Sequence, residues 1–232
     1  MVRKAGAGAA GLARDVTVRL RDLADPGYVA GTVAARSPGK PVLGIRIPLL
    51  RGAVRDALRL ARRGDGGVTP DALGAAAEAL WCGQFHEEEL TACMLLRLSG
   101  VRVNAGMIRR WAGWLDNWLS VDELGGCLGE ALVDDPALVA EVEFLAGSAS
   151  PWQRRLYVVG LIRPVREGLD PAAAGRLVQV MQDDSKPVRK ASVWLISNVV
   201  KARPSAAAQF LAVWPSSAPR PLTRLLERVS VG

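Results

Sequence analysis

Histidine and cysteine are scarce in this 232-residue chain, and their scarcity excludes several kinds of chemistry. His86 is the only histidine, so no metal site can be built from several histidines. A Ser-His-Asp or Cys-His mechanism would depend on His86 alone, which lies in the segment FHEEEL and is expected to cap or pack against a helix. The three cysteines are too widely spaced for a zinc or iron–sulfur site, and we expect them to be reduced and buried: Cys82, Cys93 and Cys127.

Long apolar runs are also missing. No run approaches the roughly 18 residues that a membrane-spanning helix needs. Arg14 interrupts the weakly apolar N-terminus, which argues against a signal peptide, and we expect a cytoplasmic protein. The letters G-x-G-x-x-G occur at 6–11, but no strand precedes them, so they do not indicate a dinucleotide site. We expect a flexible N-terminus over residues 1–11 and one domain over 12–232.

The residues that are abundant favour helix. Half of the chain is apolar, and alanine, leucine, valine and arginine dominate, while no alternating strand pattern occurs. Asp25-Pro26 and Thr69-Pro70 are expected to open helices. A further helix is expected over about 85–98, with Met94, Leu95 and Leu98 facing the core. These patterns predict an all-α protein.

The C-terminal half repeats itself. An Asp-Pro-Ala triplet occurs at 135–137 and returns about 35 residues later at 170–172, each time opening an expected helix. Pro151 and Pro187 open second helices, expected over 151–163 and 187–201, with a similar period. A period near 35 residues predicts a HEAT-like helical-repeat solenoid, a stack of antiparallel helix pairs. Last helices are expected from 204 to 214 and from about 221 to 229.

Positive charge is concentrated at the two ends of the chain. The net charge is +7, but residues 1–63 carry 13 Lys/Arg against 4 Asp/Glu, and residues 150–232 carry 13 against 5. The middle, residues 64–149, carries 4 against 14. Such a distribution suits a protein that binds a polyanion, although ordinary solvated surface is the alternative. One expected helix carries a basic stripe: Arg51, Arg55, Arg59 and Arg62.

The segment RWAGWLDNWLSVDELGGCLGEAL, residues 110–132, holds three of the seven tryptophans. Asp122 follows Trp118 by four residues, a spacing that makes helical side chains neighbours. Ser120 is expected to cap a new helix, with Glu123 completing a capping box. One interpretation is structural, with core tryptophans and an acidic first turn. The other is a site in which an aromatic wall stands beside an anion that stabilises developing positive charge.

Five segments occur in the order of a known family across about residues 28–214. They resemble the DNA alkylation repair proteins of the AlkD type, which are HEAT-like alkylpurine DNA glycosylases. The Trp-x-x-Val-Asp motif, followed by two further segments in the correct order, makes the resemblance specific. The segments are VLGIRIPLLR (42–51), ALW…FHEEELTACMLL (79–96), NWLSVDEL (117–124), PWQRR (151–155) and VRKASVWLI (188–196).

The resemblance implies roles for individual residues. Asp122 matches the family's catalytic carboxylate, and Trp118 and Trp194 match the two aromatics of its lesion site. Arg155 matches an arginine near the backbone of the lesion. The basic residues expected to contact DNA around it are Arg154, Arg189 and Lys190.

Two departures from the family's sequence pattern bear on DNA binding and on the range of substrates. Many members have an aromatic where this chain has small residues, around Ala34 and Ala35. Members often have an arginine where this chain has Ser197.

The chemistry that the resemblance implies fits these residues. An N3- or N7-alkylated purine is cationic and already a good leaving group, so one carboxylate can stabilise the oxocarbenium-like sugar and position water. We therefore predict a monofunctional alkylpurine DNA glycosylase of base excision repair that acts on duplex DNA. No metal or cofactor is required. The predicted range of substrates includes bulky adducts. The predicted role includes self-resistance to a DNA-alkylating natural product. We expect a nucleoid-associated monomer.

The alternative is a non-catalytic HEAT-like scaffold that binds DNA or a protein, because solenoids often serve as scaffolds. A helix–hairpin–helix glycosylase with an iron–sulfur cluster is excluded, since three widely spaced cysteines cannot supply four ligands.

Overall fold

The computed structural model describes residues 8–63, 67–213, 223–224 and 227. Within these residues the regular elements are all helical, which confirms the predicted all-α class. The chain divides into two compact units, Met1–Arg102 and Val103–Gly232. The single domain expected over 12–232 stays a prediction. Residues 1–7 of the expected flexible terminus, and most of the helix expected at 221–229, lie outside the described residues.

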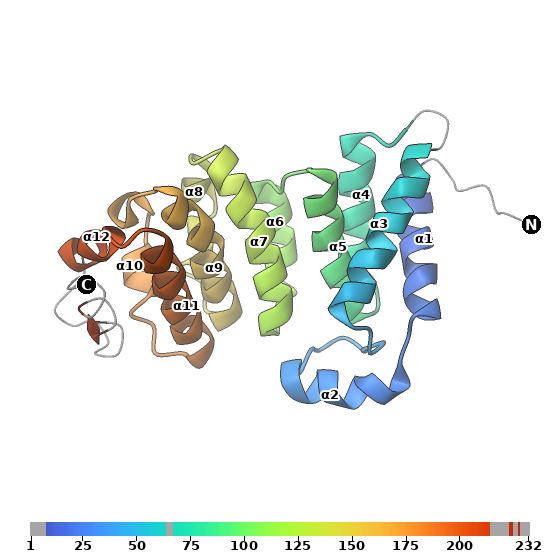
Figure 1. Cartoon of the computed structure of the whole chain (residues 1–232), viewed down its shortest axis with the longest axis horizontal. Helices are drawn as coiled ribbons and strands as arrows, with labels where there is room; N and C mark the ends of the chain where they lie inside the picture. The colour runs from blue at the N-terminus through green and yellow to red at the C-terminus, as the bar shows by residue number, and fades with distance from the viewer. Residues whose placement is uncertain (1–7, 64–66, 214–222, 225–226, 228–232) are drawn as a thin grey trace, which may run out of the picture. The chain divides into compact units, whose positions relative to one another are not determined.

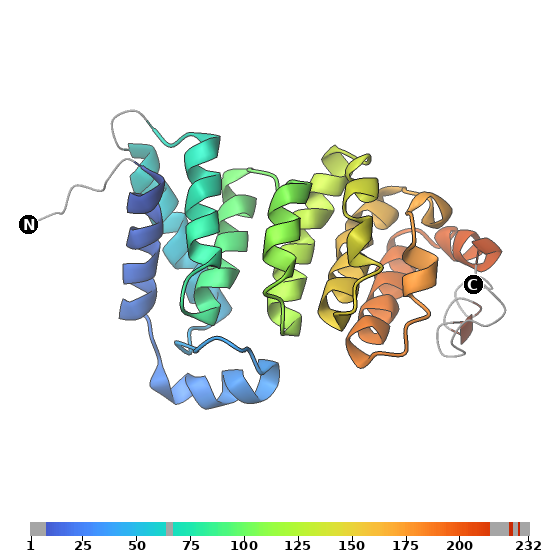
Figure 2. The same cartoon turned by 180° about the vertical axis from the view of Figure 1, so that it is seen from behind.

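Unit 1 is built from five helices within its described part. α1 packs on α3 and α4, and α5 packs on the same two helices, so that four helices enclose one apolar core. α2 runs crosswise to the others in both views (Figures 1 and 2). The bounds are α1 Ala9–Asp22, α2 Pro26–Arg36, α3 Ile47–Arg63, α4 Pro70–Trp81 and α5 His86–Ser99.

Two helix starts confirm the predicted caps. The Asp25 carboxylate accepts a hydrogen bond from the Gly27 N–H, with Pro26 at the first helical position of α2. The Thr69 hydroxyl accepts one from the Ala72 N–H in the same way at α4. These caps form because a short side chain with an oxygen precedes proline, which needs no N–H partner.

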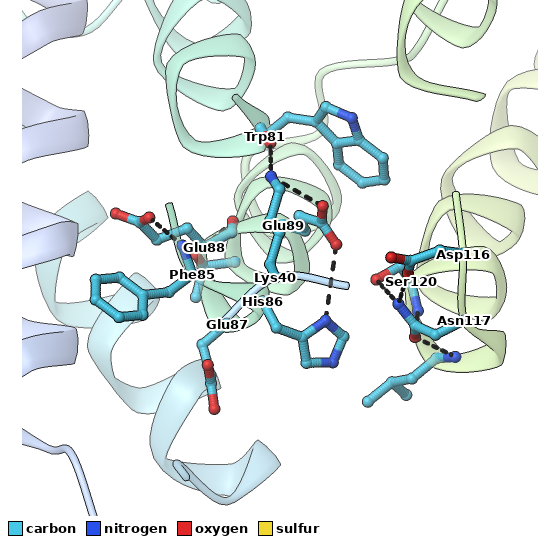
Figure 3. A network of polar contacts seen from close by, with 12 residues as sticks. Lys40, Trp81, Phe85, His86, Glu87, Glu88, Glu89, Asp116, Asn117 and Ser120 are labelled. Carbon is cyan, nitrogen blue, oxygen red and sulfur yellow. Dashed lines mark hydrogen bonds and ion pairs between the residues drawn. The ribbon is translucent and has the colours of Figure 1, made fainter. Parts of the chain in front are cut away.

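Three consecutive glutamates in the first turn of α5 are buried, which is rare for carboxylates. They diverge from the helix in Figure 3 and each has its own partners. Glu88 accepts hydrogen bonds from the Phe85 N–H and from the Thr17 hydroxyl. Glu89 lies 2.9 Å from the Lys40 ammonium, and its other oxygen lies 3.7 Å from His86 Nδ1. His86 is therefore a buried packing residue at the start of its helix, as predicted.

Glu87 anchors the segment that leads into α3. Its carboxylate accepts three hydrogen bonds, from the backbone N–H groups of Leu43, Gly44 and Ile45, at 2.9 to 3.2 Å. Gly44 has a φ of 80°, and a Cβ there would lie 2.2 Å from the Asp25 carbonyl oxygen, so only glycine fits. The buried Glu87 carboxylate thus satisfies the N–H groups of an irregular segment, which no helix or sheet would otherwise pair.

Unit 2 contains the repeated helices. α7, α9 and α11 lie side by side, with α9 packed against both neighbours (Figure 1). Consecutive long helices joined by short return elements confirm the helical-repeat solenoid in this unit. The bounds are α6 Ala105–Ala112, α7 Trp118–Asp134, α8 Leu138–Glu141, η1 Glu143–Leu145, α9 Pro151–Glu167, η2 Pro171–Ala173, α10 Leu177–Val180, α11 Lys186–Ala202 and α12 Ala206–Val213.

Three expectations about the helices of the two units are wrong in detail. The Asp-Pro-Ala triplets open only short elements, α8 with η1 and η2 with α10, because turns interrupt each return. α9 continues through a buried Pro164 to Glu167 instead of ending at Arg163. In unit 1, Met94 and Leu95 are buried as predicted, but Leu98 is 37% exposed in the last turn of α5.

Replacing Glu87 with glutamine is expected to destabilise the protein. The amide keeps one acceptor oxygen but turns an NH₂ group toward backbone donors, so buried N–H groups lose their partner. We expect the free energy of unfolding to fall by about 2–3 kcal/mol in urea denaturation. The matched control is Asp71→Asn, an exposed carboxylate in the first turn of α4. Equal stability of the two variants would contradict the anchoring role.

Candidate functional site

The start of α7 sets the position of the candidate site. Asn117, not Ser120, is the N-cap: its side-chain oxygen accepts hydrogen bonds from the N–H groups of Leu119 and Ser120, both at 3.0 Å. Its amide nitrogen donates to the Ser120 hydroxyl and to the Asp116 carboxylate (Figure 3). The predicted cap was wrong by three residues, because Asn117 already caps the helix one turn earlier and leaves Ser120 inside it. Trp118 is therefore inside the helix.

Trp118 and Asp122 lie one turn apart on α7, so their side chains are neighbours on one face. The Trp118 ring is at the surface, with 39% of the residue exposed. The Asp122 side chain is 18% exposed. A tryptophan of the core would be covered, as Trp111 is. This arrangement favours the site interpretation over the structural one.

Asp122 is held by Arg155 of α9. The guanidinium donates from Nε to Oδ1 at 3.0 Å and from Nη2 to Oδ2 at 2.9 Å. Two parallel bonds between planar groups fix the orientation of the carboxylate as well as its place. Only 7% of the Arg155 side chain is exposed, so water screens this ion pair weakly.

The same arginine reaches a third helix. Its Nη1 donates at 2.7 Å to the carbonyl oxygen of Pro187, in the first turn of α11. One guanidinium therefore joins α7, α9 and α11. A carbonyl in a first helical turn already accepts a bond within the helix, and its second lone pair is available for the arginine.

Two glycines let α7 and α9 come close enough for this contact. A Cβ on Gly125 would lie 2.5 Å from Val159 Cγ1, and a Cβ on Gly160 would lie 2.6 Å from Leu128 Cδ2. Further along, Arg163 of α9 pairs with Glu130 of α7 at 3.5 Å. The Asp122–Arg155 and Glu130–Arg163 pairs lie at matching positions, so the two helices run parallel and in register.

Burial dominates the ionisation of Asp122. Loss of solvent raises the pKa of this carboxyl to about 6, with the nearby Glu123 adding to the effect, while the charge and hydrogen bonds of Arg155 lower it. The carboxylate is thus ionised at neutral pH but protonates in mildly acidic solution.

α11 presents the remaining predicted residues. Arg189, Lys190 and Trp194 are exposed, with Trp194 at 41%, and Lys190 lies one turn from Trp194. Arg154 differs from them, because its guanidinium is engaged inside unit 2. It binds the Asp183 carboxylate and donates to the carbonyl oxygens of Ser148 and Ala149.

No cluster of three or more metal-ligating histidine, cysteine or acidic side chains occurs among the residues that the structure describes.

In the same part of the chain, no helix combines the length and apolar character needed to cross a membrane.

Comparison with known proteins decides the family. The family described as DNA alkylation repair enzyme matches residues 16–225. The chain belongs to this family. A DNA alkylation repair enzyme acts on damaged DNA, so a role in DNA repair follows, and the match spans both compact units. No protein of curated function matches the chain.

The pairing of Arg155 with Asp122 was not predicted from the sequence of this DNA alkylation repair enzyme. A signal for it exists in the helix bounds. Asp122 is the fifth residue of α7, Arg155 the fifth of α9 and Lys190 the fifth of α11. In stacked parallel helices with similar starts, equal positions lie side by side, and an acidic residue beside a basic one predicts an ion pair.

Substituting Gly125 with alanine is expected to push α7 away from α9. The added methyl meets Val159 at a distance that real contacts do not reach, and such overpacking costs about 1–3 kcal/mol of stability. Thermal and urea unfolding measure this loss of stability. The matched control is Gly74→Ala in α4, where a Cβ meets nothing within 4 Å and better helix propensity should stabilise slightly. A Gly125→Ala protein as stable as the control would refute the close-contact argument.

Proposed function

We propose that the protein is a monofunctional alkylpurine DNA glycosylase, which hydrolyses the N-glycosidic bond of cationic N3- or N7-alkylated purines in duplex DNA. The observation that carries the proposal is the largely buried Asp122 carboxylate, held by Arg155 one turn from the exposed Trp118. Membership of the DNA alkylation repair enzyme family supplies the DNA substrate.

A single carboxylate is sufficient for this reaction. Breaking the bond between an alkylated purine and deoxyribose leaves the base neutral and builds positive charge on the sugar. Protonation of the leaving group is unnecessary because alkylation has already made it cationic. An anion aimed at the sugar stabilises the charge as it develops, and its oxygen can orient the attacking water.

Arg155 acts as a positioning residue for Asp122. Its fork uses one lone pair on each carboxylate oxygen, and a carboxylate has about four acceptor positions. The remaining positions are available to the sugar and to water on the 18% exposed side. A carboxylate already fixed in orientation loses no conformational freedom when the transition state forms.

The exposed tryptophans supply binding for the cationic base. The face of an indole attracts a cation with about 0.5–2 kcal/mol. Trp118 lies on the face of α7 that carries Asp122, and Trp194 lies on the exposed face of α11 with Lys190 and Arg189. Basic side chains beside such an aromatic suit the phosphates that flank a lesion. In this proposal Arg154 contributes mainly by holding the start of α9, through its bonds to Ser148 and Ala149.

The proposal extends to the wider biological setting. Tryptophan rings at the surface can contact adducts larger than methyl, so the substrate range includes bulky adducts. The biological role then includes self-resistance to a DNA-alkylating natural product. The enzyme works as a monomer in the cytoplasm, on the nucleoid. It needs no metal or cofactor, because the reaction is a hydrolysis assisted by one carboxylate.

Asp122→Asn is expected to abolish base release and to spare DNA binding. The amide is neutral, so stabilisation of the cationic sugar is lost, and rate reductions of about a hundredfold or more follow. The measurement is release of 7-methylguanine from a duplex carrying one such lesion, with affinity measured in parallel. A bulky N3-alkyladenine duplex serves as the second substrate.

The control for this variant is Glu130→Gln, another α7 carboxylate paired with an α9 arginine, two turns beyond Asp122. It should release base normally. Full activity of Asp122→Asn would refute the proposal. Lesion-independent DNA binding without release from either substrate by the wild type would instead favour the non-catalytic scaffold.

Base release is also expected to fall in mildly acidic solution. Since the pKa of Asp122 is raised to about 6, the active, ionised fraction drops about tenfold for each pH step of one below that value. Single-turnover rates, corrected for spontaneous release, should be level above about pH 7 and decline below about pH 6. A rate that stays level down to about pH 5 would contradict the assignment of Asp122 as the ionised group.

A further inference from the structure

The basic stripe predicted on α3 is real and lies far along the chain from Asp122, in the other compact unit. Its arginines recur at helical spacing along the exposed side of α3, while Leu50, Val54 and Ala57 on the other side are buried. All of them are exposed. We name this surface the α3 arginine face: Arg51, Arg55, Arg59, Arg62 and Arg63.

The C-terminal half of this face borders a hollow of about 360 Å³ within unit 1. Leu98, the residue expected in the core, forms part of its wall from the last turn of α5. Among the described residues, which leave out 64–66 beside Arg63, those that line the hollow include none that is acidic: Arg55, Leu58, Arg59, Arg62, Arg63 and Leu98.

Intramolecular pairing neutralises little of this charge. Asp56 pairs with Arg59 at 2.7 Å, but both side chains are more than half exposed, and such pairs are weak in water. Four guanidinium groups around one hollow repel each other, so the surface favours an anionic ligand.

We propose that the α3 arginine face and its hollow bind backbone phosphates of DNA, as a second DNA-binding surface outside the unit that carries Asp122. The inference rests on the proposed function for the nature of the ligand, and it deepens that function by adding a sequence-independent contact.

The chemistry and the length of the surface match a phosphodiester chain. The guanidinium fork binds phosphate oxygens in pairs, which the ammonium of lysine does not. From Arg51 to Arg62 the helix rises about 16 Å, the axial rise of roughly five nucleotides in one strand. Leu98, 37% exposed, offers an apolar contact for the carbon face of deoxyribose between phosphates.

The test measures affinity for an undamaged duplex at several salt concentrations, using the full chain. The variant is Arg55→Gln, Arg59→Gln and Arg62→Gln together. If each arginine holds a phosphate, the slope of log affinity against log salt falls by about 0.9 per residue, or roughly 2–3 in total. Replacing the same three with lysine should restore most of the slope, because the charge returns.

The matched control removes the same charge from another helix of unit 1: Arg14→Gln, Arg19→Gln and Arg21→Gln on α1. A loss confined to the α3 variant supports the proposal. An equal loss in both variants would reduce the effect to net charge and overturn it, and an unchanged slope in the α3 variant would overturn it directly. Thermal unfolding checks that both variants fold. The assay uses no lesion and no base release, so its outcome is independent of whether Asp122 is catalytic.

Discussion

The Asp122–Arg155 ion pair is the interaction on which the functional part of the molecule depends. Burial and pairing act on the carboxyl in opposite directions, and burial prevails. The pKa of Asp122 is raised from 3.8 to about 6 in the folded protein. Above pH 6, where Asp122 is ionised, this shift lowers the free energy of unfolding by about 3 kcal/mol. The cost vanishes below pH 3.8, where the carboxyl is protonated in both the folded and the unfolded protein. Packing elsewhere in unit 2 must offset that cost, and the close glycine contact between α7 and α9 can contribute.

The solenoid brings such a site together by its geometry alone. Parallel helices in register bring the fifth residues of α7 and α9 together without any special loop. A third helix is fixed to the same guanidinium through the Pro187 carbonyl. The repeat sets where side chains meet, and the identity of the residue at each repeat position sets the chemistry.

Local signals in the sequence predicted two helix caps correctly, although a third, at Ser120, was placed one turn too late. Asp25 and Thr69 cap their helices as expected, since a cap needs only neighbours in the chain. The burial of the three glutamates of α5 has no local signal, because the N–H groups that Glu87 binds lie more than 40 residues away in the chain. Asp122 and Trp118 were singled out by their spacing and then by a resemblance, and their neighbouring positions on α7 agree with that prediction. Predicting the hydrogen bonds between Asp122 and Arg155 requires the register between α7 and α9, which the amino-acid sequence does not give directly.

Because the guanidinium of Arg155 joins three helices, the order of synthesis matters for this protein. A growing chain folds from its N-terminus. Asp122 leaves the ribosome before Arg155, 33 residues later, and Arg155 before the Pro187 carbonyl, 32 residues further on. A nascent chain that ends before α11 can already expose the arginines of α3 but lacks the Pro187 carbonyl that completes the contacts of Arg155. Assembly of the proposed catalytic group is therefore coupled to completion of the repeat stack. Truncated products would be expected to carry the arginines of α3 but to lack base-release activity.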